Sequence, residues 1–169
     1  MGLFGSKEFN TLEDLFCHQL EDLYDAEMRL TKALPKMEAA AHTPALKNAF
    51  KQHLQETENQ VNRLEQIFKQ LGKEPQRETC PAMKGLIAEG EAMIQSKGDD
   101  TVRDAALIAA AQRVEHYEMS GYGTARTFAE QLGHTQAVQL LEATLEEEKT
   151  TDAKLTQIAQ AIVNPRAPK

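Results

Sequence analysis

Apolar residues recur along most of this chain at intervals of three and four, which is the spacing of one face of an α-helix. Stretches with the alternating pattern of a strand are nearly absent. The pattern predicts four long helices, at about residues 11–41, 44–71, 101–132 and 135–162, and a shorter helix at 82–94. We therefore expect an all-α protein whose long helices pack around a shared apolar core.

Several helix ends can be read from the residues that favour them. Thr11 with Asp14 three residues later is typical of a capping box at a helix N-terminus, and Thr101 with Asp104 gives the same arrangement. Pro35 lies inside the first predicted helix, where the missing N–H should kink the helix or split it.

The connections between the helices predict the topology. The first two long helices are separated by a short turn, and so are the last two, so each pair should form an antiparallel hairpin. A long crossover with the short helix joins the hairpins, which is the ferritin-like arrangement of an antiparallel four-helix bundle. We expect a flexible N-terminus at residues 1–10, the bundle at 11–163 and a C-terminal tail at 164–169.

Composition narrows the environment in which such a bundle works. The 169 residues are 41% hydrophobic, enough for one domain with its own core. The formal net charge of −7 argues against nucleic acid as a partner. No stretch approaches the roughly 18 apolar residues of a membrane helix, and the first residues contain no signal-peptide core. Cys17 and Cys80 stand far apart, as in reduced cytoplasmic proteins. We expect a cytoplasmic protein with no membrane partner.

A weak internal repeat with an offset of 91 residues keeps glutamates in register. It superposes Glu27 on Glu118 and Glu56 on Glu147, and two leucines, Leu54 and Leu64, also fall on leucines. The repeat predicts two matched helix pairs whose glutamates belong to the shared interior.

Each long helix carries carboxylates near its middle, on or beside its apolar face. The rows of leucines and alanines include Glu27 on the first helix, Glu115 and Glu118 on the third, and Glu148 with Asp152 on the fourth. Unpaired carboxylates inside a bundle cost several kcal/mol each, and a pair of divalent cations would relieve that cost. Ion pairs with Arg or Lys, or simple solvation of a helix face, are the competing explanations.

Five runs of residues carry a family resemblance, which extends from about residue 11 to 162. The chain is similar to the bacterial YciE/YciF-type stress proteins, a branch of the ferritin-like superfamily. The resemblance implies a carboxylate-bound dinuclear metal site, with iron as the first choice, and a homodimer. The runs are LYDAE at 23–27, HLQET at 53–57, RDAALIAAAQ at 103–112, VEHYE at 114–118 and LEEEK at 145–149.

Carried over to this sequence, the superfamily scheme assigns Glu27 and Glu118 as ligands from the first and third helices, with Glu56 and Glu147 from the second and fourth. The chain departs from the common di-iron pattern, which places a histidine three residues after the second and fourth glutamates. Asn59 and Thr150 would stand at those positions.

Replacement ligands are therefore needed. Glu115 lies one turn before Glu118, and Glu148 with Asp152 forms a second chelating pair. On the fourth helix the repeat favours Glu147, whereas the leucine row favours Glu148. His53 and Gln60 are weaker candidates. A site rich in oxygen ligands would suit Fe, Mn or Mg.

The sequence leaves three functions open. The first is a ferroxidase-like oxidoreductase that handles O2 or peroxide, the second is metal binding without catalysis, and the third is a structural or interaction bundle. No catalytic residue is assigned. The complete set of expected metal ligands is Glu27, Glu56, Glu115, Glu118, Glu147, Glu148 and Asp152.

Overall fold

Five α-helices and a closing π-helical turn make up the protein between residues 7 and 169, the range that the computed structural model describes. No strand occurs in this range, so the all-α prediction is confirmed. The expected flexible N-terminus falls mostly on residues 1–6, which lie outside the described range. The elements are α1 (Leu12–Ala40), α2 (Pro44–Gln70), α3 (Pro81–Ile94), α4 (Asp100–Leu132), α5 (Thr135–Ile158) and the π-helical turn η1 (Ala159–Val163).

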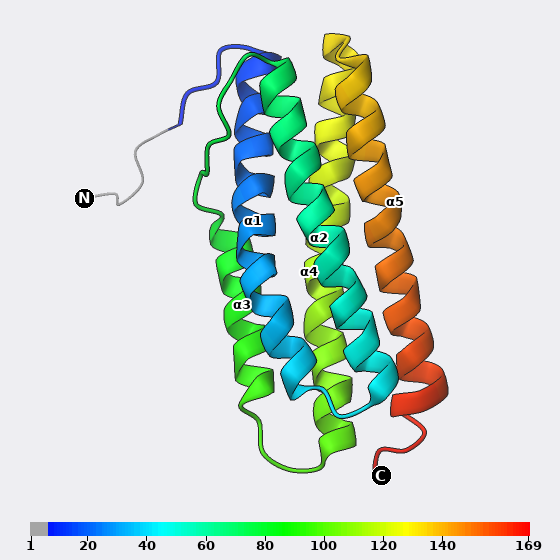
Figure 1. The fold of residues 1–169 in the computed structure, drawn as a ribbon. Coiled ribbons are helices and arrows are strands. Elements are labelled where there is room, and N and C mark those ends of the chain that lie inside the picture. Colours follow the sequence, from blue (N-terminus) through cyan, green and yellow to red (C-terminus); the bar gives the residue numbers. More distant parts are fainter. Residues whose placement is uncertain (1–6) are drawn as a thin grey trace, which may run out of the picture.

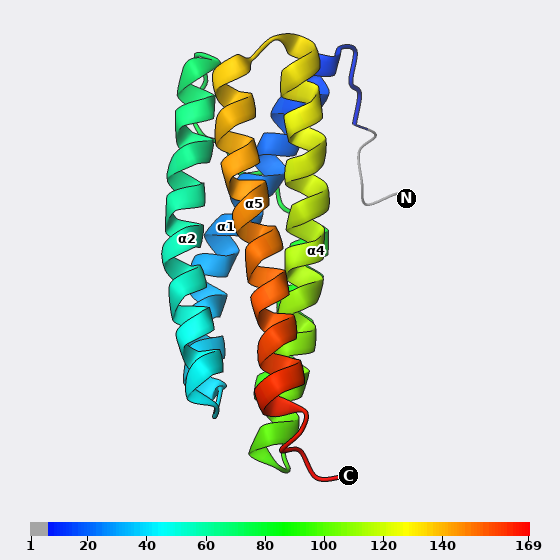
Figure 2. The same ribbon diagram turned by 90° about the vertical axis from the view of Figure 1, so that its right-hand side faces the viewer.

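The four long helices form two antiparallel hairpins, as predicted. In Figure 1, α1 and α5 run from top to bottom while α2 and α4 run from bottom to top, and α3 lies on the outside against α1 and α4. Figure 2 shows α5 in front, flanked by α2 and α4. The crossover of residues 71–99 therefore runs the length of the bundle. None of the helices between residues 7 and 169 has both the length and the apolar composition needed to cross a membrane.

The N-terminus of α1 and the C-terminus of α2 follow the sequence prediction. Thr11 accepts a hydrogen bond from the Asp14 backbone N–H, and the Asp14 carboxylate accepts one from the Thr11 backbone N–H, which completes the capping box. Gly72 ends α2 with a φ of +67°, a left-handed conformation that favours glycine. Pro35 does not split α1, which continues to Ala40.

The predicted capping box at the start of α4 is wrong. Asp99 is the N-cap, and its carboxylate accepts hydrogen bonds from the backbone N–H groups of Thr101 and Val102. Asp104 is fully buried and instead accepts the backbone N–H groups of His42 and Thr43, at 2.8 and 2.7 Å. Because these two N–H groups belong to the turn between α1 and α2, Asp104 fixes the first hairpin to α4.

Gly121 marks the close approach of α1 and α4. A Cβ added at this residue would lie 2.8 Å from Cδ2 of Leu23, which is closer than packed carbon atoms come. A Cβ at Gly123 would meet no atom within 4 Å, so only the first of the two glycines is required by packing. The tight crossing of α1 and α4 is therefore a property of Gly121.

The core is divided into two apolar halves with a polar layer between them. One half gathers around Phe16, Leu20 and Phe68, and the other around Leu34 and Leu107. Between them, at the middle of the bundle, lies a group of buried polar side chains. They are Glu27, His53, Thr57, Gln60, Glu115, Glu118, Glu148 and Thr151.

We predict that Asp104→Ala lowers the free energy of unfolding by about 2–4 kcal/mol, because two backbone N–H groups lose a charged acceptor and only partly recover water. The exposed neighbour provides a matched control, since Asp100→Ala removes a carboxylate one turn earlier and should change stability by less than about 0.5 kcal/mol. Urea unfolding followed by circular dichroism measures both. Equal effects of the two substitutions would contradict this role of Asp104.

Candidate metal centre

Three long helices bring their inward polar side chains together in the middle of the bundle. His53 comes from α2, Glu115 and Glu118 come from α4, and Glu148 comes from α5. One potential ligand atom from each of these four residues lies within 4.8 Å of the others. All four side chains are buried, at 0–3% exposure. The arrangement converges on a common point, as ligands of a metal ion do.

The remaining long helix contributes Glu27, which is fully buried beside this group. The Tyr122 hydroxyl donates a hydrogen bond to Oε1 of Glu27. Glu27 also interacts with Glu118 and with the charge of Glu148. The cluster of Glu27, His53, Glu115, Glu118 and Glu148 therefore draws on all four helices of the bundle, and we call it the central cluster.

Many polar atoms of the central cluster have no hydrogen-bond partner among residues 7–169. Five buried carboxylate oxygens and one imidazole nitrogen are in this state. An uncompensated buried polar atom costs about 1–3 kcal/mol, and a charged one more. Within the described range no Lys or Arg is paired with the four glutamates either, and the ionic contacts run only to His53. The atoms are Oε2 of Glu27, Glu115 and Glu148, both carboxylate oxygens of Glu118, and Nε2 of His53.

The proton affinities of the cluster follow from burial and from crowding of like charges. Burial and the charge of Glu148 raise the pKa of Glu27 to about 8. Burial, together with neighbouring carboxylates, raises the pKa of Glu115 and of Glu118 well above the ordinary value. Burial would lower the pKa of His53, but the charge of Glu115 and the hydrogen bond with Glu56 outweigh it and raise this pKa to about 10. Without metal, the cluster holds protons that a free glutamate would lose.

Gln60 connects the cluster to the edge of the bundle. Its amide Nε2 donates to Oε1 of Glu148 and to Oε2 of Glu147, the latter at 3.1 Å. Its own Oε1 has no partner among the described residues. Gln60 therefore orients Glu148 and leaves a further neutral oxygen in the interior.

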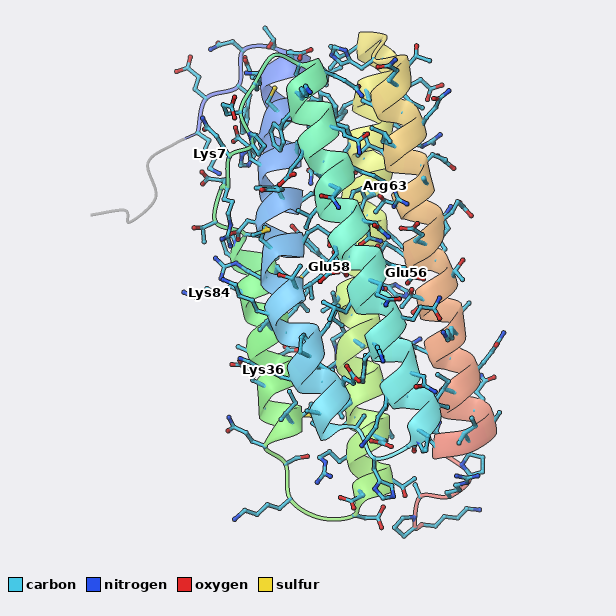
Figure 3. The ribbon with its side chains drawn as sticks, viewed as in Figure 1. Lys7, Lys36, Glu56, Glu58, Arg63 and Lys84 are labelled. Carbon is cyan, nitrogen blue, oxygen red and sulfur yellow. The ribbon has the colours of Figure 1, made fainter. Side chains whose placement is uncertain are left out.

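Glu56 and Glu147 occupy the seam between α2 and α5 rather than the interior. Glu147 forms a two-pronged ion pair with Arg63, with both N–O distances at 2.6 Å. Glu56 accepts a hydrogen bond from Gln52 at 2.8 Å and lies 3.4 Å from Nδ1 of His53. Their side chains are 24% and 28% exposed. Figure 3 shows Glu56 and Arg63 along this edge of α2. Glu56 thus borders the central cluster, whereas the charge of Glu147 is balanced by an arginine.

Asp152 is directed away from the cluster. Its carboxylate accepts a hydrogen bond from Gln112 at 2.9 Å and lies 3.4 Å from Nε2 of His116. The structure thus gathers four of the seven expected ligands in the interior, places one at the rim, and gives the other two separate partners. The four are Glu27, Glu115, Glu118 and Glu148.

His53 was only a weak candidate from the sequence, although a signal was present. The inward row of α2 passes through Phe50, His53, Thr57, Gln60 and Leu64 at spacings of three and four, and all five are buried. Glu56 lies one position outside this row. Following the apolar row, instead of the glutamate repeat, leads to His53 and Gln60.

Comparison with known proteins shows to which family the chain belongs. Residues 11–168 match the family model described as "Domain of unknown function (DUF892)". The chain belongs to this family. It is also 50% identical to Protein YciF of Escherichia coli (strain K12) over 158 residues, which cover 93% of this chain and 95% of YciF. The resemblance seen in the sequence is therefore confirmed.

Two solved structures of similar sequence superpose closely on this chain. The crystal structure of the E. coli stress protein YciF has a TM-score of 0.90 at 49% identity, covering 94% of this chain and all of that one (100%). YcfI of Rhodopseudomonas palustris, described provisionally as a structural protein, has a TM-score of 0.88 at 46% identity over 92% and 99% of the chains.

A more distant likeness identifies the class of fold. An Anabaena variabilis protein with DJ-1/ThiJ/PfpI-like and ferritin-like domains gives a TM-score of 0.60 at 16% identity, over 95% of this chain and 41% of that protein. At this identity the likeness shows the fold alone. Together with the hairpin topology, it confirms the ferritin-like four-helix bundle.

The donor set of the central cluster fits divalent metal ions. Its buried carboxylates number four, so their full ionisation would give a charge of −4, which two divalent cations would cancel. Carboxylate oxygens suit Fe, Mn and Mg, and the single imidazole of His53 favours the transition metals within that group. The unpartnered oxygens are those that such ions would satisfy.

We predict that the metal-free protein loses stability as the pH rises from about 5.5 to 8.5. The folded pKa of Glu27, about 8, exceeds its ordinary value of 4.5, so its stabilising contribution is complete at low pH and is lost as the pH rises through the folded value. The raised pKa of His53 has the same sign, with its loss continuing toward pH 10. A tenfold change in proton affinity corresponds to about 1.4 kcal/mol, or roughly 3–6 °C in melting temperature for a domain of this size.

Thermal melts in a chelating buffer test this dependence. Glu27→Gln should make the pH profile less steep, because the amide does not titrate while His53, Glu115 and Glu118 still do, whereas Glu147→Gln at the seam should leave the slope unchanged. A metal-free protein whose stability rises over the same pH range would contradict the assignment.

Proposed function

We propose that this DUF892 protein binds two divalent metal ions, iron in first place and Mn or Mg otherwise, in the central cluster. The observation that carries the proposal is the set of buried carboxylate oxygens that have no partner among residues 7–169. A bundle with no ligand to bind would be more stable with apolar residues at these positions.

The ligands are proposed from the geometry. Glu27, Glu118, Glu115 and Glu148 supply carboxylates, and His53 supplies its imidazole nitrogen. Glu56 stands at the rim as a further carboxylate, 3.4 Å from His53. Glu147 and Asp152 lack support as ligands, because each has a different partner.

Bound iron would supply redox chemistry toward O2 or peroxide, and the chain's own residues would prepare the site for it. Tyr122 holds Oε1 of Glu27 through its hydroxyl, and Gln60 holds Oε1 of Glu148 through its amide. The two apolar halves of the core exclude water on either side. Glu56, half-buried and in contact with His53, lies between the cluster and solvent, and its hydrogen bond with His53 lowers its pKa, so it stays a carboxylate.

A bound metal could serve two functions. A ferroxidase-like activity toward O2 or peroxide is our first proposal. Metal binding without catalysis is the second, and a specific observation favours it. Thr151 stands three residues after Glu148, where the common di-iron pattern has a histidine, so the site offers one buried imidazole, that of His53, among the described residues. A site rich in carboxylates and poor in imidazole also suits ions such as Mg²⁺, which do not change oxidation state, and this favours binding without catalysis.

The cellular location and the oligomeric state of the protein are proposed from the family resemblance. We propose a cytoplasmic homodimer, since closed two-fold dimers are the commonest assembly of soluble chains and the resemblance implies one. Light scattering of the purified protein measures its mass directly, and a monomer across the micromolar range would contradict this part.

We predict that Glu148→Gln weakens Fe(II) and Mn(II) binding at least about 100-fold, because it removes a charged ligand from the interior. The neighbouring Glu147→Gln disrupts the ion pair with Arg63 but keeps an amide oxygen that can accept the hydrogen bond from Gln60, so this variant should bind two ions per chain like the unchanged protein. Titration of metal-free protein followed by elemental analysis measures both. Equal losses in the two variants, or none in either, would contradict the proposed ligand set.

We also predict that saturating metal raises the melting temperature. A ligand at about 100 times its dissociation constant stabilises the fold by about 2.7 kcal/mol, or roughly 5–11 °C here. Glu118→Gln should abolish the increase. A melt that is indifferent to metal and to chelator would favour a purely structural bundle.

Oxidation of Fe(II) separates the two metal-binding proposals. Protein loaded anaerobically with Fe(II) and mixed with O2 or peroxide should oxidise iron faster than the same iron in buffer, and Glu148→Gln should remove the acceleration. Bound iron that oxidises no faster than free iron would establish the non-catalytic alternative.

A further inference from the structure

A cavity lies under α3, between this helix and the pair formed by α1 and α4. Its volume is about 40 Å³, and a cavity of about 10–15 Å³ already admits one water-sized molecule. Figure 1 shows α3 lying along the outside of the bundle. Leu86, Ile87 and Gly90 of α3 line the cavity. The cavity is therefore formed where the crossover helix packs on the four-helix core.

The walls of the cavity are almost entirely hydrocarbon. α1, α3 and α4 each contribute side chains, among them Leu34, Met37, Ile87, Ala111 and Val114. Apolar walls favour the uptake of apolar gases, whereas a cation or a strongly hydrated solute loses its hydration on entry. The chemistry of the walls therefore selects small neutral molecules.

The two ends of the cavity differ. At the inner end, the lining includes His53 and Glu115, which both belong to the central cluster. At the outer end, the lining includes Lys36 of α1 and Glu91 of α3, whose charged groups form an exposed ion pair at 2.8 Å. Figure 3 shows Lys36 at the α1 edge that faces α3. The cavity thus reaches from a surface ion pair to the candidate metal ligands.

We propose that this cavity binds a small apolar gas, O2 in the physiological case, and delivers it to the central cluster beneath α3. The cavity alone supports the binding of the gas, whereas delivery of the gas to a metal rests on the proposed function. The apolar walls exclude metal ions and disfavour hydrogen peroxide, so both must use another route, such as the seam where Glu56 lies.

α3 contains a matched pair of positions that test this site. A Cβ at Gly90 would lie 3.8 Å from Sδ of Met37, so a larger side chain there projects into the cavity. A Cβ at Gly85 would meet no atom within 4 Å. Gly90→Leu should fill the cavity, whereas Gly85→Leu makes the same chemical change on the same helix and leaves the cavity open.

Xenon is the probe, because it is apolar, monatomic and readily located. In crystals of metal-free protein pressurised with xenon, we expect one site beside Met37, Ile87 and Val114. Gly85→Leu should keep the site and Gly90→Leu should lose it. Because the larger side chain of Gly90→Leu also alters the packing of α3, Ile87→Ala serves as an independent variant that enlarges the cavity and should raise xenon occupancy. No xenon in the unchanged protein, or occupancy unaffected by both Gly90→Leu and Ile87→Ala, would overturn the proposal.

Delivery is measured on iron-loaded protein. Gly90→Leu should slow O2-driven oxidation of bound Fe(II) at least about fivefold, with iron stoichiometry and peroxide-driven oxidation unchanged, and Gly85→Leu should match the unchanged protein. Equal O2 rates in the two variants would overturn delivery through the cavity. If no iron binds, the proposed function fails while the xenon result still decides the gas site. If iron binds and xenon does not, only the present proposal fails.

Discussion

The burial of acidic side chains at mid-height of the bundle is the constraint on which the other features depend. Glu27, Glu115, Glu118 and Glu148 are almost fully shielded from water, and none is paired with Lys or Arg within residues 7–169. Taking each charge out of water costs several kcal/mol. The fold tolerates this because two apolar halves, one above and one below, supply the stability that the middle layer lacks. The cluster in turn needs protons or cations to lower its charge, which couples the stability of the bundle to pH and, if metal binds as proposed, to metal.

The helices and their order could be predicted because they depend on local patterns. Apolar spacing fixes each helical face, and Gly72 ends α2 through a backbone conformation that other residues rarely adopt. Asp104 could not be predicted in the same way. A carboxylate three residues after Thr101 looks like part of a cap, and only the assembled bundle brings the N–H groups of His42 and Thr43 to it. Contacts between distant segments of the chain leave no comparable signal in one sequence.

The internal repeat predicted the symmetry of the bundle better than the composition of its interior. Glu27 and Glu118 are both fully buried, and Glu56 and Glu147 both lie half-exposed at the α2–α5 seam, so the offset relates equivalent positions. The interior positions on α2 and α5 do not keep the same residues. Only the apolar rows, which follow burial directly, lead to these positions. The related pairs are His53 with Thr144, Thr57 with Glu148, and Gln60 with Thr151.

This loss of symmetry makes the two sides of the cluster chemically different. One side combines His53 with Glu115, whose repeat-related positions are Thr144 and Tyr24, residues with weaker or no affinity for metal. The apolar cavity under α3 reaches that same side, because its inner lining includes both residues. A crossover helix lies against only one face of a two-fold bundle, so it can give access to only one of two equivalent positions. If two ions bind as proposed, the ion beside His53 is therefore the one that a gas from the cavity meets first, and the ion held mainly by carboxylates is the more shielded of the two.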